Sequence, residues 1–337
     1  MDAVRWLGAV QSQDYAAAKW ALGQRTQGAT DRKLDGLFDE GRILRTHVMR
    51  PTWHFVLPED IRWLLDLTGP RVHLALAGRY RQLEIDERVI RRATDAFTAA
   101  LSGAHHRTRP ELGAVLQAAG ISPDGQRLPH LISAAELNGV IASGPRRGKQ
   151  FTYALLAERA PKARVIDRAT ALAELARRYF RSHGPAQVQD FVWWSGLTAA
   201  DARTGIAGSG VTLEHEVVGG KDYWFDAEAG SIAKGGKAAH LLPNFDEYTV
   251  GYRDRAAAVH PEVRFEPAMF SFGSILANVV VVAGRVRGAW RRTLTPAGVR
   301  VEIRLLARLK PAEVAAVEAA ARRLGGFLER PVKLVWI

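Results

Sequence analysis

The stretch RILRTHVMRPTWHFVLP at residues 42–58 decides the fold. Residues such as Val48 and Phe55 favour β-strands, and Arg50-Pro51 is predicted to form the turn between two short strands. Two helices are predicted before this hairpin, one from Asp14 and one begun by Asp31 and ended by Gly41. Helix, helix, then hairpin is the order of a winged helix, with the hairpin as the wing.

The same order is predicted twice more along the chain. HRTRPELGAVLQAAG (106–120) reads as a helix begun by Pro110, and NGVIASGPRRGKQFTYALL (138–156) as two strands around a basic turn. A third series begins at SHGPAQVQDFVWWSG (182–196) and ends in VTLEHEVVGGKDYWFD (211–226), with Gly219-Gly220 at the hairpin turn. Three repeats in the same order predict tandem winged helices.

Beyond Pro243 the pattern changes to β-rich segments. Residues 275–294 and 299–309 favour strands, a helix is predicted from Pro311 to Leu324, and PVKLVWI (331–337) forms the last strand. These segments are typical of a small β-barrel or curled sheet with one helix. We therefore expect an α+β fold with three tandem winged-helix (helix-turn-helix) units and a C-terminal β-barrel. The expected domains are 1–85, 86–162, 163–255 and 256–337.

The composition of the 337-residue chain excludes several classes of protein. Cysteine is absent, which excludes disulfides, thiolate zinc sites, iron–sulfur clusters and a cysteine nucleophile. The 47 Lys and Arg against 35 Asp and Glu give a net charge of +12, which suits nucleic acid or simply reflects a GC-rich genome. No apolar run is long enough for a membrane helix or a signal peptide, so a cytoplasmic protein is expected.

Common catalytic motifs are missing from the sequence. It has no phosphate-binding loop, no H-E-x-x-H metal motif and no G-x-S-x-G nucleophile motif, and His105-His106 lacks a third ligand nearby. We therefore expect no metal, no nucleotide cofactor and no other cofactor.

A pair of glutamines, Gln11 and Gln13, lies just before the first strongly predicted helix. Two amides can hold a water and a sugar by hydrogen bonds, although neither can take a proton as a carboxylate does. On a regular helix the two side chains would point about 200° apart, so they converge only in an irregular segment. The alternative is that both amides make ordinary polar contacts at a helix cap.

Two basic clusters lie on the predicted wings. Alternation places Arg45 and His47 on one face of the first strand, and Thr52 and His54 on one face of the second, with Trp53 and Phe55 on the opposite, buried face. Such groups suit phosphate contact, and a solvated wing is the alternative. The candidate DNA-binding residues of the first wing are Arg45, His47, Arg50, Thr52 and His54.

The second wing has a basic tip formed by Arg146, Arg147 and Lys149. Gly144 and Gly148 flank this tip, so it could approach a nucleic-acid backbone closely. A basic turn without a partner is the alternative.

Three strings, LGAVQSQDYAAAKWALGQR (7–25), GRILRTHVMRPTWHFV (41–56) and HLLPNFDEYTVGYRDR (240–255), resemble the AlkZ/YcaQ-like family of winged-helix DNA glycosylases. The resemblance runs over nearly the whole chain. It implies tandem winged helices, a C-terminal β-barrel, and removal of bulky or crosslinked N7-alkylated purines from DNA. The family's Gln–aliphatic–Gln/Asp signature falls on Gln11-Ser12-Gln13, so the resemblance makes Gln11 and Gln13 catalytic, with Ser12 in place of the aliphatic residue. Relatives also carry an N-terminal helical segment before Ala3, so a start further upstream is expected.

The leading hypothesis is a monofunctional DNA glycosylase that acts in repair of alkylation damage and interstrand crosslinks. The alternatives are a non-catalytic winged-helix DNA-binding or regulatory protein, and a protein whose basic charge is compositional and whose partner is another protein. Double-stranded DNA is the expected partner, and the protein is expected to be a nucleoid-associated monomer. The charged residues of the third string could form a structural ion-pair network or contact DNA: Asp246, Glu247, Arg253, Asp254 and Arg255. A structural role is expected for the three acids.

Overall fold

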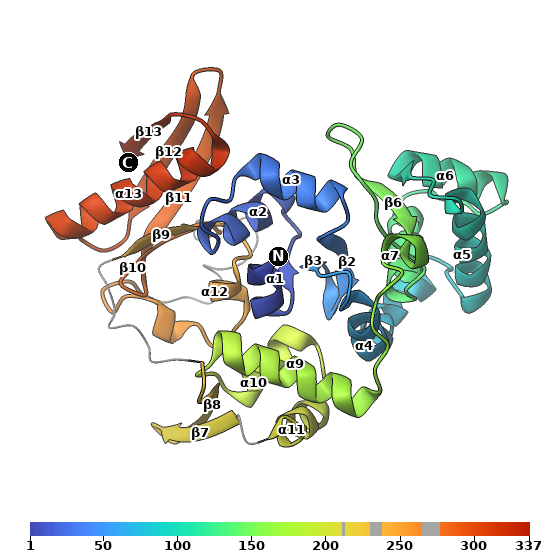
Figure 1. Ribbon diagram of the computed structural model, residues 1–337, viewed down its shortest axis with the longest axis horizontal. Coiled ribbons are helices and arrows are strands. Elements are labelled where there is room, and N and C mark those ends of the chain that lie inside the picture. Colours follow the sequence, from blue (N-terminus) through green and yellow to red (C-terminus); the bar gives the residue numbers. More distant parts are fainter. Residues whose placement is uncertain (211–212, 230–237, 265–276) are drawn as a thin grey trace. The chain divides into compact units, whose positions relative to one another are not determined.

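The computed structural model describes residues 1–210, 213–229, 238–264 and 277–337. Figure 1 shows a mixture of helices and small sheets. The chain divides into two compact units, which we call unit 1 (Met1–Val10 and Gly36–Asp226) and unit 2 (Gln11–Asp35 and Ala227–Ile337). The glutamine pair therefore belongs to unit 2, and both basic clusters belong to unit 1.

The N-terminal region follows the expected order of two helices and a hairpin, preceded by one more helix and a short strand. Asp14 begins the second helix, because its carboxylate accepts a hydrogen bond from the Ala17 N–H at 3.0 Å. The elements are α1 (Asp2–Leu7), β1 (Val10–Gln11), α2 (Tyr15–Gln24), α3 (Asp31–Asp39), β2 (Leu44–Val48) and β3 (Arg50–Val56).

The first hairpin turns one residue earlier than expected. The sequence predicted the turn at Arg50-Pro51, but Arg50 already belongs to β3 and the turn falls at Met49, whose φ is 65°. The end of α10 (Val188–Ser195) lies against this turn. Its capping residue Gly196, at φ 72°, comes so close that an added Cβ would lie 2.2 Å from the Met49 carbonyl oxygen.

The second series repeats the order and adds a complete small sheet. Thr108 and Glu111 form a capping box at the start of α6, and Pro110 lies in its first turn, as expected. The strand order is β4-β6-β5. The elements are α4 (Ile61–Gln82), α5 (Glu87–Leu101), β4 (Arg107–Thr108), α6 (Arg109–Ala118), α7 (Arg127–Leu137), β5 (Ile141–Ser143), β6 (Thr152–Leu155) and α8 (Leu156–Arg159).

The third series is α9 (Arg168–His183), α10, α11 (Ala199–Gly208), β7 (Leu213–Val218) and β8 (Lys221–Asp226). Thr198 caps α11, and Gly219-Gly220 form the turn at positive φ, both as expected. A backbone bridge between Ala186 and Trp224 stands where β4 stands in the second series. Residues 211–212 of the predicted hairpin lie outside the described residues.

Unit 2 is built on a five-stranded sheet in the order β13-β12-β11-β10-β9, and α13 packs along it (Figure 1). The helix extends one turn beyond its expected end. The described strands form an open order, so the closed barrel is not confirmed; residues 275–276 of the predicted β-rich stretch lie outside the described residues. The elements are β9 (Ala239–Leu242), α12 (Glu247–Val250), a 3-10 turn (Ala256–Ala258), β10 (Val279–Val282), β11 (Arg285–Thr295), β12 (Gly298–Leu305), α13 (Pro311–Leu328) and β13 (Val332–Trp336).

Helix α2 joins this sheet although it lies far away in sequence. The buried Trp20 donates its indole N–H to the Leu241 carbonyl at 2.7 Å and packs against Phe327 of α13. The segment that follows the glutamine pair is therefore anchored to β9 and α13. Within the described residues, no helix has both the length and the apolar character needed to cross a membrane.

Candidate functional site

The glutamine pair lies in a non-helical segment of unit 2. Gln11 ends β1, Ser12 has no regular structure, and Gln13 lies in a bend just before the Asp14 cap. Gln11 is only 6% exposed and Ser12 is fully buried, whereas Gln13 is exposed. The irregular backbone meets the condition under which two amides spaced two residues apart can serve one site.

Two neighbouring acids of the third string fix both ends of this segment. Glu247, which is 2% exposed, accepts the backbone N–H of Gln11 at 2.7 Å. Asp246, which is fully buried, binds the guanidinium of Arg25 with both oxygens, at 2.7 and 2.9 Å. Burial alone lowers the pKa of Arg25, but the charge and hydrogen bond of Asp246 outweigh it, so that pKa is raised.

The structural role expected for Asp246 is thereby confirmed. The contact of Glu247 with Gln11 was missed from the sequence, since 236 residues separate the two. The only signal was that both residues lie in strings typical of one family.

The lysine nearest the glutamine pair is held by acids. Lys19 is buried, and its ammonium group lies 2.8 Å from Asp31 and 2.7 Å from Asp35. The Tyr15 hydroxyl also donates to Asp35 at 2.9 Å. The Lys19 amine is therefore engaged by two carboxylates of the same unit.

Arg45 and His47 lie on the aromatic face of the first hairpin, not on the face away from it. Antiparallel pairing sets Arg45 opposite Phe55 and His47 opposite Trp53, so the four share one face. The Arg45 guanidinium lies 4.2 Å from the Trp53 ring centre and 4.8 Å from that of Phe151. Arg45 is 8% exposed and His47 is 9% exposed, with the His47 ring bound to the buried Glu136.

The other three residues of the first cluster differ in exposure. His54 is fully buried, and its Nδ1 lies 3.0 Å from the Thr52 carbonyl oxygen. Arg50 and Thr52 are partly exposed, and the Arg50 guanidinium lies 5.8 Å from the ring centre of Trp193. A direct phosphate contact is thus accessible to Arg50. It would require rearrangement at Thr52, whose hydroxyl oxygen is buried, and at Arg45, His47 and His54. DNA contact by all five stays a prediction.

The two predicted wings lie side by side within unit 1. The Arg45 N–H donates to the Ser143 hydroxyl of β5 at 2.8 Å. At the second tip, Arg146 pairs with Asp39 at 3.4 Å and Arg147 with Glu111 at 2.7 Å. Lys149 is exposed and has no polar partner among the described residues. Lys149 is therefore the group of this tip most available to an external anion.

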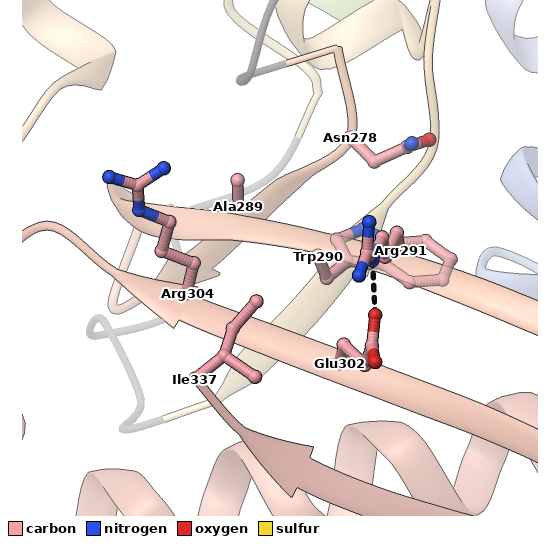
Figure 2. Close-up of a pocket in the computed structure, with 7 residues that line it drawn as sticks. All are labelled: Asn278, Ala289, Trp290, Arg291, Glu302, Arg304 and Ile337. Carbon is pink, nitrogen blue, oxygen red and sulfur yellow. Dashed lines mark hydrogen bonds and ion pairs between the residues drawn. The ribbon is translucent and has the colours of Figure 1, made fainter.

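A hollow of about 310 Å³ lies beside the sheet of unit 2 (Figure 2). Figure 2 shows the Arg291 guanidinium facing the Glu302 carboxylate, which Arg300 also binds at 2.9 Å. Hydrogen bonds from both arginines lower the pKa of Glu302. A second hollow of about 670 Å³ lies in unit 1 between α4 and α5, beside His73 and Tyr80. Neither hollow is lined by a residue that the sequence predicted for the site.

Comparison with known proteins agrees with this architecture. A family model described as DNA glycosylase AlkZ-like matches residues 4–327. Among solved structures, the chain is similar to Streptomyces sahachiroi DNA glycosylase AlkZ, with a TM-score of 0.78 and 23% identity over 99% of this chain and 93% of that chain. No match was found among curated proteins. At this identity the structural likeness concerns the fold.

Proposed function

The chain belongs to the family of AlkZ-like DNA glycosylases, and on this premise we propose that it hydrolyses the N-glycosidic bond of N7-alkylated purines in double-stranded DNA, with Gln11 and Gln13 as its catalytic pair. The observation that carries this proposal is the family match over residues 4–327, which includes the Gln11-Ser12-Gln13 signature. We propose bulky and crosslinked adducts as the preferred lesions.

The proposed reaction needs no acid and no cofactor from the protein. An N7-alkylated purine already carries a positive charge. When the C1′–N9 bond breaks, its electron pair moves to N9, and the base leaves as a neutral molecule. The deoxyribose then carries an oxocarbenium-like positive charge. A water oxygen bonds to C1′, and this water releases one proton to solvent. Amide oxygens that accept hydrogen bonds orient this water and stabilise the sugar cation. We assign the water to Gln13, which is exposed, and the sugar to Gln11.

The local structure supports this assignment at two points. Because residues 11–14 are not helical, the two glutamines are free of the opposed orientation that a helix would impose. Ser12 departs from the aliphatic residue typical of the signature, but it is fully buried as an aliphatic residue would be. Serine at position 12 therefore adds a hydroxyl to the protein interior, and we propose that it leaves the placement of the Gln11 and Gln13 side chains unchanged.

For the architecture, we propose that the three helix–hairpin series are winged helices with boundaries at 1–85, 86–162 and 163–255, and that 256–337 forms a curled sheet or barrel. The strand order β4-β6-β5 and the Ala186–Trp224 bridge support two of these assignments. We propose that the protein acts on duplex DNA as a monomer without a nucleotide cofactor. Nucleoid association follows only from this DNA binding.

Within the two predicted wings, we propose a division of labour. Arg50, Arg147 and Lys149 would contact phosphates directly because they are at least partly exposed. Thr52 would do so only after its buried hydroxyl turns outward. The buried Arg45, His47 and His54 would shape the hairpin that presents them. Arg146, paired with Asp39, would reach DNA only by exchanging that partner.

The closing experiment measures base release. Purified protein is incubated with a duplex containing N7-methylguanine, and with one containing a mustard crosslink, and the free base is quantified by mass spectrometry. The matched control is the Gln11→Ala/Gln13→Ala variant. We expect release by the native protein and a loss of at least about 100-fold in the variant. Equal release by both proteins would contradict the assignment of the glutamines.

The runner-up function is a DNA-binding protein without catalysis, and Ser12 in the signature is the observation that favours it. In that case the native protein would bind the duplex with an affinity that falls as salt rises, and neither protein would release base. An affinity independent of salt would count against both functions.

A further inference from the structure

We propose that Glu247 is a positioning residue of the reaction, which fixes the main chain of Gln11 so that its amide faces the sugar; this inference rests on the proposed function. The established family signature covers the glutamines, whereas Glu247 lies in a different string of the sequence. Its oxygen Oε1 accepts the Gln11 N–H at 2.7 Å, and both residues are buried.

The choice of a carboxylate for this contact is informative. Backbone N–H groups are ordinarily satisfied by backbone carbonyls or water, which cost less to bury than a charged side chain. A charge-assisted hydrogen bond is shorter and stronger than a neutral one, and it holds its donor in a fixed direction. The buried carboxylate of Glu247 therefore fixes the backbone of Gln11, the last residue of β1, more firmly than ordinary backbone pairing would.

The backbone around Glu247 is also constrained. Phe245 has φ 61°, the left-handed region that residues with a Cβ seldom adopt. Asp246 caps α12 by accepting the Tyr248 N–H at 2.9 Å while it binds Arg25 at the end of α2. The strained turn thus directs two consecutive carboxylates to the two ends of the segment from Gln11 to Arg25. Such strain persists where the surrounding structure enforces it, which is common at functional sites.

The test combines kinetics with amide hydrogen exchange. In Glu247→Ala the single-turnover rate of N7-methylguanine release should fall about 10- to 100-fold, because a misplaced group loses rate steeply. Affinity for a duplex with a stable abasic analogue should stay within about threefold. Hydrogen exchange of the Gln11 backbone N–H should accelerate. Glu247→Gln keeps an acceptor oxygen at the same place and should restore most of the rate and the protection. If Glu247→Ala does not fold, Glu247→Asp, shorter by one methylene, replaces it.

Two controls separate positioning from folding. Glu313→Ala removes a carboxylate that accepts the Lys310 N–H at 2.7 Å at the start of α13, and it should lower the unfolding midpoint while leaving the rate within about threefold. In a Gln11→Ala background, Glu247→Ala should cause little further loss of rate, because the group that it positions is gone. Full additivity of the two losses would overturn the proposal.

The remaining outcomes are also decisive. Unchanged Gln11 exchange in Glu247→Ala would overturn the proposal even if the native protein is active. If the native protein releases no base, the proposed function fails first and the positioning role fails with it, whatever the exchange shows. If the native protein is active and the Glu247 variants keep its full rate, the proposed function stands and this inference alone is wrong.

Discussion

Replacement of Gly196 by alanine should destabilise unit 1 more than replacement of any exposed turn glycine. Gly196 caps α10 at φ 72°, and a Cβ added there would lie 2.2 Å from the Met49 carbonyl oxygen at the turn of the first hairpin. Two costs therefore combine at one position. The first is the left-handed backbone, and the second is a steric overlap with main chain that cannot swing aside.

The magnitude follows from these two terms. The left-handed conformation costs an alanine about 1–2 kcal/mol. An overlap with backbone forces a shift of the hairpin turn, and overpacking of this kind costs about 1–3 kcal/mol more. We expect the free energy of unfolding to fall by about 2–5 kcal/mol in Gly196→Ala.

Gly219 offers a matched control in the same unit. It also has positive φ, 59°, but an added Cβ would meet no atom within 4 Å. Gly219→Ala should therefore show only the backbone term, about 1–2 kcal/mol. Urea unfolding at 25 °C, monitored by tryptophan fluorescence and circular dichroism, measures both. A loss in Gly196→Ala no larger than that in Gly219→Ala would refute the claim that α10 is packed against the hairpin turn.

Two further predictions concern the charges of unit 1. Burial alone raises the pKa of Asp60, but the hydrogen bond and charge of Arg178 outweigh it and hold that pKa below its ordinary value. The ionised Asp60 therefore adds stability above its unfolded pKa of about 3.9, and this stability is lost as pH falls through the lower folded value. Asp60→Ala leaves Arg178 with Glu174, at 2.7 Å, as its carboxylate partner and should cost about 1.5–3 kcal/mol at pH 7. The difference from native should shrink toward pH 3 in urea titrations; a pH-independent difference would contradict the ion-pair account. At the second tip, Lys149→Ala should weaken duplex binding and reduce the slope of log affinity against log salt by about 0.9. Lys162 is also exposed, so Lys162→Ala is the charge-matched control and should leave the slope unchanged. Equal slopes for native protein and Lys149→Ala, measured by fluorescence anisotropy, would remove Lys149 from the DNA contact.

The sequence predicted most local elements correctly because their signals are local. Asp14 and Thr198 cap helices, Pro110 lies in the first turn of α6, and Gly219-Gly220 form a hairpin turn through contacts within a few residues. Such short-range hydrogen bonds and φ preferences can be read from the residue types. The family resemblance likewise rested on strings that the sequence displays, and the family model matches residues 4–327.

The sequence failed where a distant partner decides the outcome. The turn of the first hairpin falls at Met49, where Gly196 at the end of another helix packs against it. Phosphate contact by Arg45 and His47 stays a prediction, but the sequence did not reveal the cross-strand register that sets them beside Trp53, Phe55 and Glu136. The alternation of side chains along one strand does not reveal which residues of the partner strand lie on the same face of the sheet.

The sequence by itself determined the composition, the helix and turn signals, and the glutamine pair with its family signature. Only the tertiary structure decided that Gln11 lies outside any helix and that its N–H meets Glu247 across 236 residues. Burial, cross-strand register and the pairing of distant charges depend on how segments pack. These properties are collective, so no stretch of the chain carries them alone.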